Sequence, residues 1–217
     1  MISRKVFIFL MAILLICPAY AYDDGLVTAH EPVLNKWLLN VTLYDDGLVE
    51  DIIQAEINDS DSFHIDGFSF KIPGSDIKMY NFTHTTNAGI GKQQNVPGGK
   101  ELIIDFNKST TGKWDGGIGF TAENWTIKEN SNYSINIPIE MPVIIADQNI
   151  KSNMLIPSDA DIRAQILLPK SIDVTFVAPK PSRILPQQDK IVLTWDKLRI
   201  NDAIIINWKV KGTAKII

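Results

Sequence analysis

The side chains that most often bind metals or act as nucleophiles, histidine and cysteine, are scarce in this chain. It has three histidines, His30, His64 and His84, and one cysteine, Cys17. The histidine spacing fits no short zinc motif, and a site made of His64, Asp66 and His84 would need two strands to bring these residues together. We therefore interpret the histidines as polar residues on strand faces, and we expect neither a metal nor a cofactor.

Carboxylates could support two further kinds of chemistry. Residues 58–62 place several side-chain oxygens together, as part of a calcium loop does. They lack the glycine of the sharp turn and the glutamate that closes a calcium loop, so a solvated turn is the preferred interpretation. Hydrolysis by paired carboxylates needs two acids facing one cleft, and no G-x-S-x-G motif is present. We expect no enzymatic activity; a calcium-binding structural protein and a carbohydrate-active protein are the alternatives.

Two tryptophans are candidate binding residues. Trp114 lies in a glycine-rich segment, residues 113–117, and Trp125 has the opposite alternation phase to Phe120 and Ala122. An exposed indole beside Asp and Asn is a common platform for stacking sugars or a partner surface. The alternative is that each indole covers an open end of a sandwich. The other tryptophans lie in periodic strands and are predicted core residues: Trp37, Trp195 and Trp208.

The first 21 residues have the features of a secretory signal peptide. Arg4 and Lys5 precede an apolar run over residues 6–16, and Ala19-Tyr20-Ala21 has the small-x-small pattern of a cleavage site. The run is about half of the roughly 20 residues that span a bilayer, so we expect no transmembrane anchor in the mature chain. Cleavage after Ala21 would place the protein in a secreted or extracytoplasmic location, at the cell surface or in a periplasm-like space. It would also remove Cys17, which excludes disulfides and thiolate chemistry.

The composition indicates a folded, acidic globule. Hydrophobic residues make up 45% of the chain, and the formal net charge is −4. Lysine and arginine are dispersed, without the basic stripe that nucleic-acid binding needs. We therefore expect no nucleic-acid partner.

Six N-x-S/T sequons are candidate glycosylation sites, and none lies in the C-terminal third: Asn40, Asn58, Asn81, Asn107, Asn124 and Asn132. Their use would cover the N-terminal half with glycans and leave the C-terminal half free to dock. The alternative is that strands rich in Asn, Ser and Thr generate sequons that are not used.

Most of the mature chain alternates apolar and polar residues with a period of two. This pattern indicates antiparallel strands with one face on a core and one in water. Asp46-Gly47 predicts a tight hairpin turn after the first strand. Asp51 then falls in the inward phase of the next strand, so it is either re-aimed by a bulge or partly buried with a partner.

These elements predict an all-β fold, an antiparallel β-sandwich. Two immunoglobulin-like sandwiches in tandem are expected, over residues 35–138 and 142–217, after the signal peptide at 1–21. We also expect the last strand to be an open sheet edge that could pair with a partner strand.

The C-terminal strands carry a series of landmarks: Ile166-Leu167-Leu168-Pro169, Val177-Ala178-Pro179-Lys180-Pro181, Leu193-Thr194-Trp195-Asp196-Lys197-Leu198 and Ile204-Ile205-Ile206-Asn207-Trp208. With the residue 44–47 hairpin, they resemble the extracytoplasmic β-sandwich domains of uncharacterised archaeal secreted or membrane-anchored proteins, and loosely the lumenal sandwiches of ribophorin-type subunits. The resemblance implies a non-catalytic secreted or cell-surface protein that binds another protein or a glycan through sheet faces and loops.

Overall fold

The period-two sequence folds as strands throughout the described part of the chain, and this confirms the all-β prediction. The computed structural model describes residues 31–58, 64–83, 88–140, 142–146, 150–152 and 154–211, and no helix is found among them. The predicted signal peptide, His30 and His84 lie outside the described residues. Burial alternates over most of the strands Val33–Leu43, Val49–Asn58 and Asp161–Pro169, with every second side chain inside, as the sequence pattern requires.

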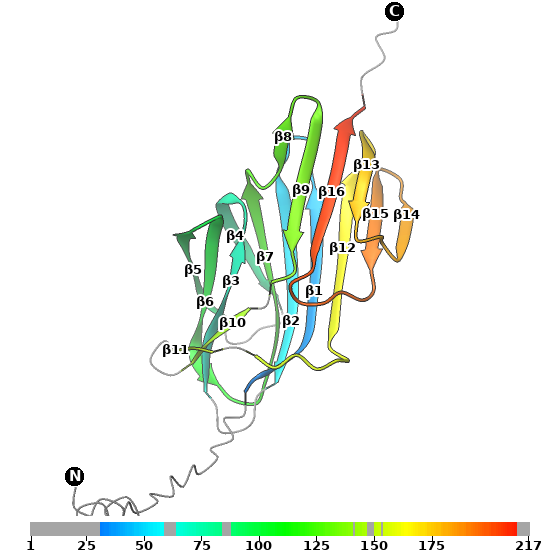
Figure 1. The fold of residues 1–217 in the computed structure, drawn as a ribbon. Helices are drawn as coiled ribbons and strands as arrows, with labels where there is room; N and C mark the ends of the chain where they lie inside the picture. The colour runs from blue at the N-terminus through cyan, green and yellow to red at the C-terminus, as the bar shows by residue number, and fades with distance from the viewer. Residues whose placement is uncertain are drawn as a thin grey trace, which may run out of the picture.

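The described strands form three sheets (Figure 1). Sheet A contains, in spatial order, β14 (Arg183–Pro186), β15 (Lys190–Trp195), β12 (Asp161–Pro169), β1 (Val33–Leu43), β2 (Val49–Asn58), β7 (Lys113–Glu123) and β4 (Ser75–Thr83). Sheet B contains β11 (Ile150–Ser152), β10 (Val143–Ala146), β3 (Ile65–Ile72), β6 (Gly99–Thr110) and β5 (Ala88–Val96). Sheet C contains β13 (Ile172–Ala178), β16 (Ala203–Val210), β9 (Asn132–Pro138) and β8 (Ile127–Glu129).

Sheet A links the two halves of the sequence. Its middle pair, β1 and β12, runs parallel, with Trp37 opposite Ile162 and Val41 opposite Ile166. The expectation of a purely antiparallel sandwich is therefore wrong at this one pair among the described strands. A parallel pair requires a long crossover, and here the connection from β1 to β12 includes sheet B and half of sheet C. That residues 35–138 and 142–217 form two independent domains remains a prediction. In the folded chain, both segments contribute strands to sheets A and C.

The predicted hairpin between β1 and β2 is confirmed. Gly47 has a φ of 89°, and its N–H donates to the carbonyl oxygen of Tyr44 at 3.1 Å. The Asp46 carboxylate accepts a hydrogen bond from the N–H of Leu48 at 3.0 Å. A positive φ is the reason that the sequence needs glycine at this position.

The core lies between sheet A and the other two sheets. Trp37 on β1 meets Phe70 on β3 edge-on at 5.9 Å between ring centroids, which joins sheets A and B. Trp195 on β15 donates from Nε1 to the carbonyl oxygen of Pro179, just after β13, at 2.9 Å and so joins sheets A and C. The predicted core tryptophans are confirmed, because Trp37, Trp195 and Trp208 are at most 4% exposed.

The last strand differs from the prediction of an open edge. β16 pairs with β13 on one side and with β9 on the other, so its backbone is already hydrogen-bonded in sheet C. The C-terminal edge of sheet A is instead the short strand β14, on the right in Figure 1. Among the described residues, no helix has the length and apolar character needed to cross a membrane.

Candidate functional site: a buried carboxyl group where three sheets meet

Asp51 is the most deeply buried carboxylate among the described residues, with 1% of its surface exposed, compared with 7% for Glu101. On β2 it belongs to the inward set that includes Val49 and Ile53, and it lies opposite Val41 on β1 and Phe120 on β7. Neither ladder has a register shift at this point. No bulge turns the side chain away from the core. Of the two alternatives considered for Asp51, a buried carboxyl group is therefore confirmed. The partner expected for it is missing at one of its two oxygens.

The surroundings of Asp51 favour its neutral form. Burial away from water is the largest effect on its pKa, while hydrogen bonding from the backbone N–H groups of Asn40 and Ile52 acts in the opposite direction. The result raises the pKa of Asp51 to about 7. Its Oδ1 atom is buried and has no hydrogen-bond partner in the protein. The carboxyl group therefore has an unused acceptor and gains or loses its proton near neutral pH.

A small cavity adjoins this carboxyl group. The space that it leaves for a water-sized molecule is about 20 Å³. Sheet A contributes Trp37 and Phe120, sheet B contributes Phe70 and Lys71, and the chain around sheet C contributes Trp125 and Glu140. Lys71 is exposed and Glu140 is half-buried, so the polar part of the lining lies toward solvent. This arrangement can hold a small hydrogen-bonding molecule and can bind or release a proton.

The candidate binding tryptophans are not exposed, and this part of the sequence analysis is wrong. Trp114 is 4% exposed; its ring lies 4.9 Å from that of Phe68 and stacks on Phe106 at 5.5 Å. Trp125 is 6% exposed, and its Nε1 donates to the carbonyl oxygen of Asn136 at 2.9 Å. Strand β7 turns Trp114 toward sheet B, so the glycines around it do not form a surface loop. Neither indole can stack on a ligand at the surface.

The described residues provide few metal ligands. His64 is exposed just before β3, and no group of three or more His, Cys, Asp or Glu side chains that could hold a metal ion occurs in the described ranges. Residues 59–63, which include most of the calcium-like segment, lie outside those ranges.

The sequons are distributed over several strands and turns. Four have exposed asparagines: Asn58, Asn107, Asn124 and Asn132. Asn40 is half-buried on β1, with a 3.5 Å contact from Nδ2 to the carbonyl oxygen of Ile52. The side chain of Asn81 lies outside the described set. The exposed sequons are sterically open to modification, whereas Asn40 in its folded position is less open.

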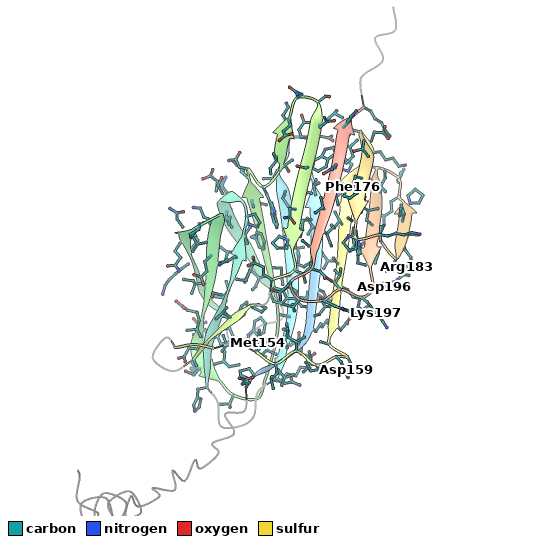
Figure 2. The ribbon with its side chains drawn as sticks, viewed as in Figure 1. Met154, Asp159, Phe176, Arg183, Asp196 and Lys197 are labelled. Atoms are coloured by element: carbon teal, nitrogen blue, oxygen red, sulfur yellow. The ribbon has the colours of Figure 1, made fainter. Side chains whose placement is uncertain are left out.

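A charged network at the β14 edge was not foreseen from the sequence. Arg183 on β14 forms an ion pair with Asp196 at 2.8 Å, and Figure 2 shows both at the edge of sheet A. Arg163 on β12 pairs with Asp161, which lowers the pKa of that aspartate through the hydrogen bond to the guanidinium. The Arg183–Asp196 pair depends on the register of β14 against β15, which no local sequence pattern specifies.

Comparison with known proteins gives one family match. Residues 34–115 match the family model described as multicopper oxidase, and this segment is less than half of the chain. No curated protein matches the chain.

Several solved structures share a general similarity of fold. An M1 zinc metallopeptidase from Deinococcus radiodurans matches with a TM-score of 0.48 and 7% identity, over 83% of this chain and 42% of that chain. A mutant of it bound to a Tyr-Ser-Ala substrate matches equally, over 82% and 42%. A two-domain M1 zinc metallopeptidase mutant bound to L-tryptophan gives 0.45 at 7% identity, over 82% and 43%. The chain spans less than half of these peptidases, and TM-scores below 0.5 carry no argument about this protein.

The family match corrects the function expected from the sequence. The expectation was a non-catalytic binding or structural protein, with carbohydrate-active and calcium-binding alternatives, and it is contradicted by the match to an oxidase family. The expected lack of enzymatic activity is contradicted by the same finding. The resemblance to extracytoplasmic archaeal proteins is confirmed only as far as the β-sandwich arrangement.

The donor set of the matched segment tests whether copper fits it. A blue copper centre uses two histidines and a cysteine thiolate, with a weak axial ligand. Residues 34–115 contain no cysteine and two histidines, of which only His64 lies in the described part. A thiolate copper centre therefore does not fit this segment, and the shared feature is the strand framework.

Proposed function

We propose that this chain is an oxidase-related domain, in which residues 34–115 form the β-sandwich framework of a multicopper oxidase domain. The observation that carries the proposal is the family match over β1 to β6 and the first residues of β7. Because the match covers less than half of the chain, the assignment to this functional class is a proposal.

The structure supports this proposal because the matched segment contains strands of two sheets that pack on each other. β1, β2 and β4 belong to sheet A, and β3, β5 and β6 belong to sheet B, so the segment supplies both layers of a sandwich. The rings of Trp37 and Phe70 meet between these layers, as do those of Phe68 and Trp114. Aromatic contacts of this kind join the two sheets into one core.

The described residues include no group of three metal-binding side chains, and His64 stands exposed before β3. Imidazole is the ligand type present in the chain that suits copper, since no cysteine follows Cys17. His64 is therefore expected to be dispensable for any copper-dependent activity.

Oxygen uptake by the full chain tests the proposal. The protein is loaded with Cu²⁺, desalted and assayed with an aromatic diol as electron donor, beside the same amount of Cu²⁺ in buffer. We expect uptake above the buffer control, without the strong visible absorption of copper bound to thiolate, and unchanged by His64→Ala. Uptake equal to the buffer control would overturn the oxidase proposal. Loss of activity in His64→Ala would overturn the expectation that His64 is dispensable.

Export and glycosylation are part of the same proposal. The signal-like residues 1–21 support export to an extracytoplasmic space, and the exposed sequons at Asn58, Asn107, Asn124 and Asn132 support modification there. Kinship with the archaeal extracytoplasmic sandwiches is consistent with this location. A protein or glycan at the cell surface is the partner class that such a location favours.

A further inference from the structure

We propose that the cavity beside Asp51 is a binding site for a single water molecule, which donates a hydrogen bond to Oδ1 of the Asp51 carboxyl group. The site is independent of the oxidase proposal, because it rests only on the core where the three sheets meet.

The first observation is the unpartnered oxygen. Asp51 is 1% exposed, and its Oδ1 accepts no hydrogen bond from the protein. Buried polar atoms in folded proteins nearly always have a partner, either in the protein or in an ordered water molecule. Leaving such an acceptor without a partner is unfavourable, so a donor from solvent is favoured.

The second observation is a small cavity that Asp51 lines. The cavity leaves about 20 Å³ for the centre of a water-sized molecule. One water needs roughly 10–15 Å³ on this measure, so the cavity accommodates one molecule with little space to spare.

The lining shows why a neutral molecule is favoured over a cation. Trp37 and Leu39 from β1, Ile53 from β2 and Phe120 from β7 carry no charge. The titratable groups of the lining other than Asp51 itself are Lys71 from β3 and Glu140 after β9. Burial keeps the carboxyl group of Asp51 largely protonated below neutral pH, which weakens its attraction for a metal ion.

No donor among the lining residues is hydrogen-bonded to Oδ1 of Asp51. The indole N–H of Trp125 already donates to the carbonyl oxygen of Asn136. Lys71 is exposed and Glu140 is half-buried, so they can provide further partners for a water molecule. A bound water would in this way link the buried carboxyl group to the polar side of the cavity, through which its proton can exchange.

A high-resolution crystal structure of the full chain tests the site, with Asp51→Asn, Asp51→Leu and the exposed control Asp173→Asn beside it. We expect one water peak at hydrogen-bonding distance from Oδ1 in the wild type and in Asp173→Asn. Asp51→Asn should retain the peak, because its amide also presents polar atoms to the cavity. Asp51→Leu should lose it, because leucine offers no polar atom.

Two results would overturn the assignment. An empty cavity in the wild type would mean that the carboxyl group is buried without a partner. A peak with the short ligand distances of a metal ion would replace water by a cation. If Asp51→Leu does not fold, the wild type and Asp51→Asn decide the question by themselves.

Discussion

Replacing Asp51 by asparagine should remove a large pH dependence of stability. The pKa of this carboxyl group rises from 3.8 in the unfolded chain to about 7 in the folded protein. Well below pH 3.8 both states hold the proton. Between pH 4 and 7 the unfolded state releases it first, so the free energy of unfolding falls as the pH rises. A difference of about 3 pKa units corresponds to a loss of about 4 kcal/mol, complete somewhat above pH 7.

The assay is urea unfolding of wild type and Asp51→Asn at a series of pH values from 4 to 8.5. Subtracting the two curves removes the contributions of the other titrating groups, which both proteins share. The free energy of unfolding of Asp51→Asn, relative to wild type, should rise by about 4 kcal/mol across this range. The control Asp173→Asn makes the same chemical change at an exposed carboxylate on β13, so it shows what the substitution does without burial.

A flat curve for Asp51→Asn would refute the reasoning. It would mean that the folded protein supplies the charged carboxylate with partners that balance its burial. A curve that falls with rising pH would mean that the folded state binds the anion, and the neutral-acid interpretation would then be wrong.

Two further predictions follow from the corrected tryptophan positions and from the sequons. Trp114→Ala should lower the free energy of unfolding by about 3–5 kcal/mol, because the indole ring packs on Phe68 and Phe106. Trp114→Phe should lower it by clearly less. Denaturant unfolding measures both changes, and an unchanged stability would contradict the burial of Trp114. Intact-mass spectrometry of the native protein should give the mass of residues 22–217 plus sugar increments. Substitution by glutamine at any one of four exposed sequons, Asn58, Asn107, Asn124 or Asn132, should remove one increment. A bare polypeptide mass would show that the sequons are unused.

The strand content was predictable because the alternation of apolar and polar residues lies within each strand. Alternation in β1, β2 and β12 is set by one buried face, and that face is visible in the order of residues. The hairpin at Asp46-Gly47 was predictable for the same reason, since its positive φ depends on a single local residue. These are properties of a few consecutive positions.

The sheet assembly could not be predicted in this way. The parallel pairing of β1 with β12 joins residues more than 100 positions apart, and a period of two is the same in parallel and antiparallel ladders. The burial of Trp114 had a local signal that was misjudged. Gly116 and Gly117 suggested a loop, yet they lie within β7 opposite Ala55 and Gln54 of β2.

Part of the Asp51 site was visible in the sequence. Its inward phase between Val49 and Ile53 identified a carboxyl group directed into a core. The missing partner and the cavity were not visible, because the lining comes from β1, β2, β3, β7 and the chain around β9. Only the folded chain brings those residues together.

The family match and the donor set answer different physical questions. A sandwich framework depends on the placement of apolar residues along strands, which many sequences can satisfy while their polar positions change. A copper centre depends on a few side chains of defined chemistry at defined positions. Residues 34–115 match the family model but contain no cysteine, and their described part has one histidine. If the chain acts in an oxidase, its copper must therefore be held without thiolate from this segment, and the absorption spectrum of the copper-loaded protein separates that arrangement from a blue copper centre.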